Sequence, residues 1–318
     1  MAVDQDEVIG GKKNFWLYSK DKGFDLTHPA TPSSPPIYPR IPLRTTKADI
    51  AVDPAKTALV VVDLQNYFLS PLLGRPKEGI GIDLVGRLLN QAIPACRKAG
   101  IPIVWLGWGL TQEDVDVMPP AIVKGFAADA NFDGPRKVGS LGSEIGPLEC
   151  HDGTVINGGR VLMRGAWNTA FYSPLADVSE PGDIWVSKNR LSGFWGGTGI
   201  EEILEERCIR TLLFSGANTD QCVAGSLQDA FTKGWDCLML KDGASIHSDD
   251  YAARLHEGVG VDRYLLHTRI SPQPSDFGGV RAMSMNPRCL RPTIMMRLPR
   301  ARGKVIDGIT HMPEKHDS

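Results

Sequence analysis

Three reactive side chains follow three predicted strands of this 318-residue chain. Asp63 comes directly after the apolar run TALVVV, Lys188 ends the run DIWVSK, and Cys222 follows the run RTLLFSG at the start of a predicted helix. Ligands of open parallel sheets bind beyond the carboxyl ends of the strands, where loops from several strands meet. A carboxylate, an ammonium group and a thiol gathered there could act as base, cation and nucleophile of a hydrolytic reaction.

Each of the three residues alone has a simpler explanation. An aspartate after a strand is often a helix cap, a lysine is usually solvated, and a free cysteine packs as a small apolar residue. The position of Cys222 favours chemistry, because a helix N-terminus and a nearby lysine both stabilise a thiolate. We therefore predict that the pKa of Cys222 lies well below the ordinary thiol value of about 8.5. The other five cysteines lack this setting.

The segments that must position these residues alternate between two periodicities. Continuous apolar runs predict buried strands, and apolar residues at helical spacing predict amphipathic helices. The predicted strands cover residues 57–65, 101–108, 183–188, 210–216 and 236–243, and the predicted helices cover 84–99, 199–208 and 221–234. Such alternation is typical of an α/β fold with a parallel sheet covered on both faces. Residues 109–180, rich in glycine and interrupted by prolines, are expected to shape a pocket or an interface.

The chain divides into a central domain and two ends. We place an N-terminal extension at residues 1–56, the domain at 57–269 and a C-terminal extension at 270–318. Six prolines between Pro29 and Pro42 disfavour helix and central strand alike. We expect this end to lie as an extended arm over the domain or a neighbouring subunit, with a mobile tail as the alternative.

Composition excludes several classes of protein. The 35 basic and 37 acidic residues give no electrostatic basis for nucleic-acid binding. No apolar run reaches the roughly 20 residues that a membrane span needs, and the acidic N-terminus has no apolar signal segment. We expect a cytoplasmic protein with reduced cysteines. The seven scattered histidines form no HExxH pair, so we expect neither a bound metal nor another cofactor.

Three segments, in this order, resemble the isochorismatase-like cysteine hydrolases. They are VVVDLQNYF (60–68), VSKNRLSGFWGGTGIEEIL (186–204) and GANTDQCVAGSLQDAFTKGWDCLMLKDGAS (216–245). VWLGWGL (104–110) and residues 164–195 are similar to the ureidoacrylate amidohydrolase-like group of that family. The N-terminal extension, the C-terminal extension and the loop 111–160 depart from the pattern, which leaves the substrate open.

The resemblance implies a three-layer α/β/α fold with a mainly parallel sheet. It also implies that Asp63, Lys188 and Cys222 form a catalytic triad. A cis peptide is implied between Ala217 and Asn218, with the backbone N–H groups of Asn218 and Cys222 binding the oxyanion. Nicotinamidases of this family bind a metal through histidines in the loop after the second strand, and the corresponding loop here (108–120) has no histidine.

These observations predict hydrolysis of a C–N bond in a small ureido, carbamoyl or amide substrate. The alternatives are a vinyl-ether hydrolase of the isochorismatase type, which needs no thiol, and a non-catalytic binding protein on the same scaffold. We expect a small-molecule substrate and a homo-oligomer, either a dimer or a tetramer. Arg190 could bind a substrate carboxylate or form a surface ion pair, and the aromatic candidates could instead belong to the core. The candidate substrate-binding residues are Gln65, Asn66, Trp108, Asn168, Arg190, Phe194 and Trp195.

Overall fold

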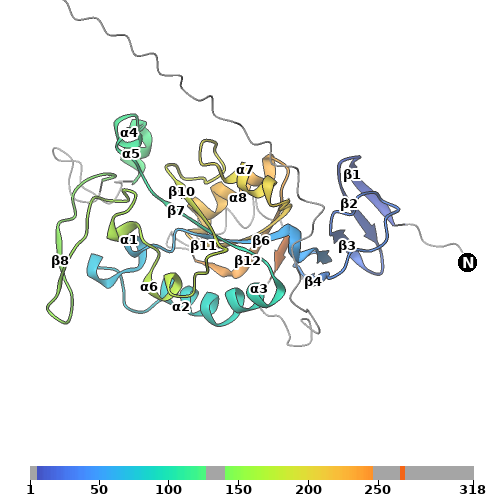
Figure 1. Cartoon of the computed structure of the whole chain (residues 1–318), viewed down its shortest axis with the longest axis horizontal. Coiled ribbons are helices and arrows are strands. Elements are labelled where there is room, and N and C mark those ends of the chain that lie inside the picture. Colours follow the sequence, from blue (N-terminus) through green and yellow to red (C-terminus); the bar gives the residue numbers. More distant parts are fainter. Residues whose placement is uncertain (1–5, 127–139, 246–265, 269–318) are drawn as a thin grey trace, which may run out of the picture. The chain divides into compact units, whose positions relative to one another are not determined.

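The computed structural model describes residues 6–126, 140–245 and 266–268 (Figure 1). Its central sheet has six parallel strands in the order β10-β7-β6-β11-β12-β13. These strands are β6 (Thr57–Val62), β7 (Ile103–Trp108), β10 (Ile184–Lys188), β11 (Thr211–Ala217), β12 (Asp236–Ser245) and β13 (Leu266–Thr268). The five strands predicted from apolar runs are all present, and β13 was not predicted.

Helices cover both faces of this sheet (Figure 1). One core contains Val60 and Val62 of β6 together with side chains of α7 (Ile200–Glu206) and α8 (Ala224–Thr232). The other contains Leu59 and Val61 together with α2 (Ile80–Arg87) and α3 (Ile93–Ala99), which the π-helical segment Leu88–Ala92 joins. Since successive strand residues point to opposite faces, one apolar run supplies both cores. The three-layer α/β/α fold is confirmed.

The region between β7 and β10 contains short elements that were not predicted individually. They are α4 (Gln112–Asp116), α5 (Pro120–Phe126), the hairpin of β8 (Pro147–Glu149) and β9 (Val155–Asn157), and α6 (Ser173–Ala176). Another short helix, α1 (Asn66–Leu69), follows Asp63. None of these described elements adds a strand to the central sheet. No helix in the described ranges is both long and apolar enough to cross a membrane.

The N-terminal extension forms a sheet of its own, so the expectation of an extended arm is wrong. The sheet has the order β1-β2-β3-β5-β4, from β1 (Glu7–Gly11), β2 (Asn14–Ser19), β3 (Gly23–Leu26), β4 (Ile41–Arg44) and β5 (Asp49–Val52). Buried side chains such as Leu26, Ile50 and Val52 supply its apolar face. Most of the prolines lie in the irregular connection between β3 and β4, and Pro42 lies on the edge strand β4, where proline is tolerated.

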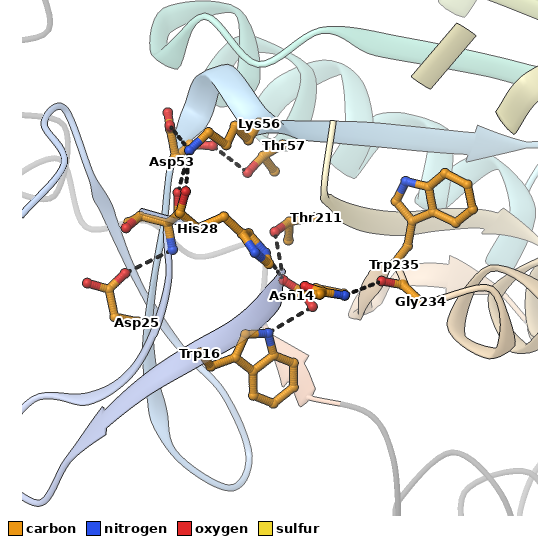
Figure 2. A network of polar contacts seen from close by, with 12 residues as sticks. Asn14, Trp16, Asp25, His28, Asp53, Lys56, Thr57, Thr211, Gly234 and Trp235 are labelled. Carbon is orange, nitrogen blue, oxygen red and sulfur yellow. Dashed lines mark hydrogen bonds and ion pairs between the residues drawn. The ribbon is translucent and has the colours of Figure 1, made fainter. Parts of the chain in front are cut away.

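Partly buried polar contacts attach this N-terminal sheet to the central one (Figure 2). The side chain of Asp236, the first residue of β12, accepts a hydrogen bond of 2.9 Å from the Trp16 indole, and Nε2 of His28 lies 2.6 Å from its other oxygen. Lys56 donates to the carbonyl oxygens of Thr27 and His28 at 2.8 and 2.7 Å. These contacts lie at the amino ends of β6 and β12, opposite the carboxyl ends that carry the predicted catalytic residues. The predicted C-terminal extension lies outside the described residues.

Candidate active site

The three predicted catalytic residues lie at the carboxyl ends of three strands of the central sheet. Asp63 follows β6, Lys188 ends β10, and Cys222 lies in the short helix Thr219–Val223 after β11. Asp63 has a left-handed backbone (φ +53°), which is uncommon for a residue with a side chain. Its N–H donates to the carbonyl oxygen of Leu106 in β7 at 2.9 Å. The chain therefore turns out of the sheet at Asp63, while its backbone stays bonded to the neighbouring strand.

The side chains of these three residues meet. The Nζ atom of Lys188 lies 2.9 Å from Oδ2 of Asp63 and 3.4 Å from Sγ of Cys222. Lys188 is fully buried, Asp63 is 1% exposed and Cys222 is 7% exposed. Because a buried charge is costly unless it is paired, the ammonium and the carboxylate depend on each other here. The arrangement places a base, a cation and a nucleophile within one small volume.

Two further groups hold Lys188 in place. Its Nζ donates to the carbonyl oxygen of Arg190 at 3.2 Å and lies 4.0 Å from the centre of the Trp108 ring. An ammonium over an indole face is attracted by the negative face of the ring. Trp108 was predicted as a substrate-binding residue, and the structure places its ring against the predicted catalytic lysine.

Burial and charge set the protonation of the thiol. Burial and the neighbouring Asp63 carboxylate raise the pKa of Cys222 to about 12, although Lys188 and Trp108 lower it. The prediction of a lowered pKa is therefore wrong. It considered the helix N-terminus and Lys188, whereas desolvation and the adjacent carboxylate disfavour the thiolate more strongly. Both effects favour the neutral thiol over the thiolate.

Burial also raises the pKa of the Asp63 carboxyl above its ordinary value. The charge of Lys188 and hydrogen bonds with Cys222 and Lys188 oppose this shift. A carboxylate with a raised pKa is a stronger base than an exposed one. Asp63 is therefore suited to accept the thiol proton when the sulfur attacks a substrate.

The side chains of two predicted substrate-binding residues, Gln65 and Asn168, form hydrogen bonds with the backbone. The Gln65 amide nitrogen donates to the carbonyl oxygens of Trp108 and Thr169 at 2.7 and 2.6 Å, and its oxygen accepts from the Trp108 N–H at 3.0 Å. The Asn168 amide accepts from the Leu162 N–H at 2.7 Å and donates to two carbonyl oxygens. Both side chains are buried. The structure thus gives both a role in holding loops together, and contact with substrate is not needed to explain them.

Asn66 and Phe194 are likewise explained by packing. The amide nitrogen of Asn66 donates to the carbonyl oxygen of Trp167 at 2.9 Å. The Phe194 ring is fully buried and lies 6.1 and 5.7 Å from the rings of Phe214 and Trp235. Phe194 was predicted as either a substrate-binding residue or a core residue, and the structure supports the core residue.

Arg190 and Trp195 form a separate group beside the site. The Arg190 guanidinium lies 4.9 Å from the centre of the Trp195 ring, and Trp195 is 44% exposed. Nη1 of Arg190 donates to the Asn189 carbonyl oxygen at 2.7 Å and lies 3.3 Å from Sδ of Met118. Among the residues that the structure describes, Arg190 is in no ion pair. The surface ion pair considered for Arg190 is therefore not observed there.

The pairing of Asp114 with Asn189 was not predicted from the sequence. The Asn189 amide donates to Oδ1 of Asp114 and accepts from the Trp195 indole at 3.1 Å. Asp114 is also part of the capping box of α4 with Thr111. Although burial raises the pKa of Asp114, hydrogen bonds from Thr111 and Asn189 lower it below the ordinary value. The capping pattern of Thr111 and Asp114 is visible in the sequence. The contact of Asp114 with Asn189 depends on the fold.

The peptide bond between Ala217 and Asn218, implied to be cis by the resemblance, is cis in the structure. It lies at the end of β11, directly before the helix that carries Cys222. Within the described ranges, no three histidine, cysteine or acidic side chains gather as a metal-binding group. The expectation that the protein needs no metal stays a prediction.

The similarity to known proteins covers the part of the chain that carries Asp63, Lys188 and Cys222. The family model described as the isochorismatase domain matches residues 57–259, more than half of the chain. The chain belongs to the isochorismatase family. The ureidoacrylate amidohydrolase RutB of Methylobacterium radiotolerans is 32% identical over 200 residues, which cover 61% of this chain and 68% of that protein. The N-terminal sheet of this isochorismatase-family member precedes the matched residues.

Two solved structures illustrate the similarity in three dimensions. An isochorismatase family protein of Desulfovibrio vulgaris is 19% identical, with a TM-score of 0.49 over 68% of this chain and 94% of that one. N-carbamoylsarcosine amidase of Thermoplasma acidophilum is also 19% identical, with a TM-score of 0.47 over 69% of this chain and 99% of that one.

Proposed function

We propose that the protein is a cysteine-dependent amidohydrolase that cleaves a C–N bond of a small ureido, carbamoyl or amide substrate. The supporting observation is that Lys188 Nζ lies 2.9 Å from Asp63 and 3.4 Å from Cys222 in a buried site. The name of the relative RutB, a ureidoacrylate amidohydrolase, agrees with this reaction class. The substrate is proposed here only as a class.

In the first half-reaction the Cys222 sulfur attacks the substrate carbonyl carbon. Since the pKa of the thiol is about 12, its proton leaves only as the attack proceeds, and Asp63 accepts it. Lys188 stabilises the negative charge on the sulfur, and the backbone N–H groups of Asn218 and Cys222 stabilise the oxyanion. Asp63 then passes the proton to the leaving nitrogen. The C–N bond breaks, ammonia or an amine leaves, and a thioester remains on Cys222.

In the second half-reaction water hydrolyses the thioester. Asp63, again ionised, takes a proton from the water as its oxygen attacks the acyl carbon. The C–S bond breaks, the sulfur regains a proton from Asp63, and the acid product leaves. One carboxylate therefore serves both halves of the cycle. We further propose that Arg190, held over Trp195, binds a carboxylate of the substrate.

The proposal is tested by trapping the acyl group. Ureidoacrylate and a panel of other ureido acids, carbamates and amides are first screened for ammonia release. With the best substrate, acid quench during turnover is expected to show a protein heavier by the acyl mass, and digestion is expected to place that mass on the peptide with Cys222. Asp63→Asn should slow both formation and loss of the adduct.

A matched cysteine serves as the control. Cys96 in α3 is also buried, and burial raises its pKa to about 12 as well. Cys96→Ala should retain the adduct and most of the turnover, whereas Cys222→Ala should lose both.

The two alternative functions predict different results. A vinyl-ether hydrolase would release a ketone such as pyruvate from isochorismate, with no covalent adduct and no ammonia. A binding protein without catalysis would turn over none of these compounds. Either result would contradict the amidohydrolase proposal and leave the fold unchanged.

A further inference from the structure

Strand β1 is an exposed edge of the N-terminal sheet. Among the described strands it pairs only with β2, and all five of its residues are exposed, including Val8 (47%) and Ile9 (37%). An edge strand presents unpaired N–H and C=O groups, and proteins usually protect such edges with lysines, prolines or a covering element. β1 contains no proline and no lysine. Within the described residues, this edge is therefore open to another strand.

The charges around β1 are arranged in two blocks of opposite sign. Asp6 and Glu7 precede the uncharged residues Val8–Gly11, and Lys12 and Lys13 follow them. None of these four charged side chains is in an ion pair with another residue of the described ranges. Two copies of β1 that run antiparallel would place the acidic block of each beside the lysines of the other. A parallel arrangement would place like charges together.

The pairing of two β1 strands can be described by the residues that it sets opposite each other. Gly11 lies opposite Asn14 across a two-residue hairpin turn, and the other edge of β1 pairs with no described strand. An antiparallel pair of two β1 strands centred on Ile9 sets Val8 opposite Gly10 and Asp6 opposite Lys12.

We propose that β1 pairs with β1 of a second copy of this chain in an antiparallel, two-fold manner. The two five-stranded sheets would then form one continuous sheet across the dimer. The Ile9 side chains would meet at the two-fold axis, and Val8 would be covered by the partner strand. Since the N-terminal sheet is attached at the amino ends of the central strands, the interface leaves the carboxyl ends with Asp63 and Cys222 free.

Charge exchange on the full-length chain tests this interface. One variant carries Asp6→Lys and Glu7→Lys, and the other carries Lys12→Glu and Lys13→Glu. Each variant alone places like charges opposite each other, so its dissociation constant in sedimentation equilibrium should rise at least about tenfold over that of the unchanged chain. A 1:1 mixture of the two restores opposite charges, and it should associate as the unchanged chain does.

Two further variants make the test specific. Lys20→Glu with Lys22→Glu changes the same charge in the exposed turn between β2 and β3, and it should leave association unchanged. Val8→Pro removes a backbone N–H from β1, and it should weaken association. Turnover should be unaffected in every variant. An unchanged chain that stays monomeric at all concentrations, or a mixture that fails to associate, would overturn the proposal.

Discussion

The Lys188 ammonium lies 2.9 Å from the Asp63 carboxylate although β10 and β6 are not neighbours in the sheet. β7 separates the two strands, and it supplies Trp108, whose ring contacts Lys188 Nζ. The long lysine side chain spans this interval while both charges are withdrawn from water. A buried pair of this kind has a specific energetic consequence, because removing one partner leaves the other charge uncompensated.

Lys188→Met should abolish turnover and also destabilise the fold. The substitution leaves the Asp63 carboxylate buried without its cation, and we expect the free energy of unfolding to fall by about 3–5 kcal/mol. Adding Asp63→Asn removes the remaining charge, and the double variant should recover most of the stability while staying inactive. Urea denaturation measures the free energy of unfolding of the single variant and of the double variant. Equal stability of the single and double variants would contradict the coupling of the two charges.

Alkylation of Cys222 should be slow at neutral pH and should accelerate with alkali. With a pKa of about 12, the thiolate fraction at pH 7 is about 10⁻⁵, and the rate should rise about tenfold per pH unit below the pKa. Iodoacetamide labelling of the Cys222 peptide, followed by mass spectrometry, gives the rate at each pH. The urea-unfolded chain is the reference, in which the thiol should react at its ordinary pKa. A rate that is already at its plateau at pH 7 would mean that the thiolate is stable at rest.

The acid limb of the pH–rate profile should lie above the ordinary titration range of aspartate. Burial raises the pKa of Asp63, and only its ionised form can accept the thiol proton. As the pH falls through this raised pKa, the carboxylate is protonated and kcat/KM should decrease. Assays of kcat/KM from neutral to acidic pH measure the midpoint. A midpoint at or below about 3.9 would show that Lys188 outweighs burial.

The sequence was sufficient for five strands of the central sheet and for placing Asp63, Lys188 and Cys222 at or just beyond the carboxyl ends of three of them. The apolar runs that form β6, β7 and β11 are fully buried and can have few other conformations in an α/β chain. The N-terminal sheet was not predicted. The proline-rich segment between β3 and β4 indicated irregular structure, and it obscured the short apolar alternations on either side of it.

Side-chain roles within the site depended on contacts that no spacing reveals. Gln65 and Asn168 have the residue type of ligand-binding amides, yet their hydrogen-bonding capacity is taken by loop backbone. The pKa of Cys222 was predicted in the wrong direction because burial and the distance to Asp63 are properties of the packed structure.

Exchange of Asp114 and Asn189 should show that this pair positions Lys188. Asn189→Asp alone places two carboxylates together, and we expect it to lower kcat about 5- to 30-fold, equivalent to about 1–2 kcal/mol. The added Asp114→Asn restores one donor and one acceptor, and it should recover most of kcat. The acid midpoint of the pH profile should stay constant, because neither residue is the base. Failure of the exchange to recover kcat would contradict a positioning role.

Asp236 should be important for stability and unimportant for turnover. Its carboxylate binds Trp16 and His28 across the two sheets, so Asp236→Ala leaves an indole N–H and an imidazole without their acceptor (Figure 2). Charge-assisted hydrogen bonds contribute about 1.5–3 kcal/mol each, and we expect the free energy of unfolding to fall by at least about 2 kcal/mol. Limited proteolysis should cut the N-terminal sheet faster than in the unchanged chain.

The position of Asp236 explains why the substitution should affect stability and leave turnover unchanged. It begins β12 at the amino end of the sheet, whereas Asp63 and Cys222 lie beyond the carboxyl ends of β6 and β11. At a temperature where the variant stays folded, its kcat/KM should therefore match that of the unchanged chain. Asp21→Ala, in the exposed turn between β2 and β3, is the control and should change the free energy of unfolding by less than about 0.5 kcal/mol. If Asp236→Ala reduced kcat/KM as strongly as Asp63→Asn, the N-terminal sheet would have to influence the catalytic end of the domain, and its attachment site could no longer be regarded as separate from the active site.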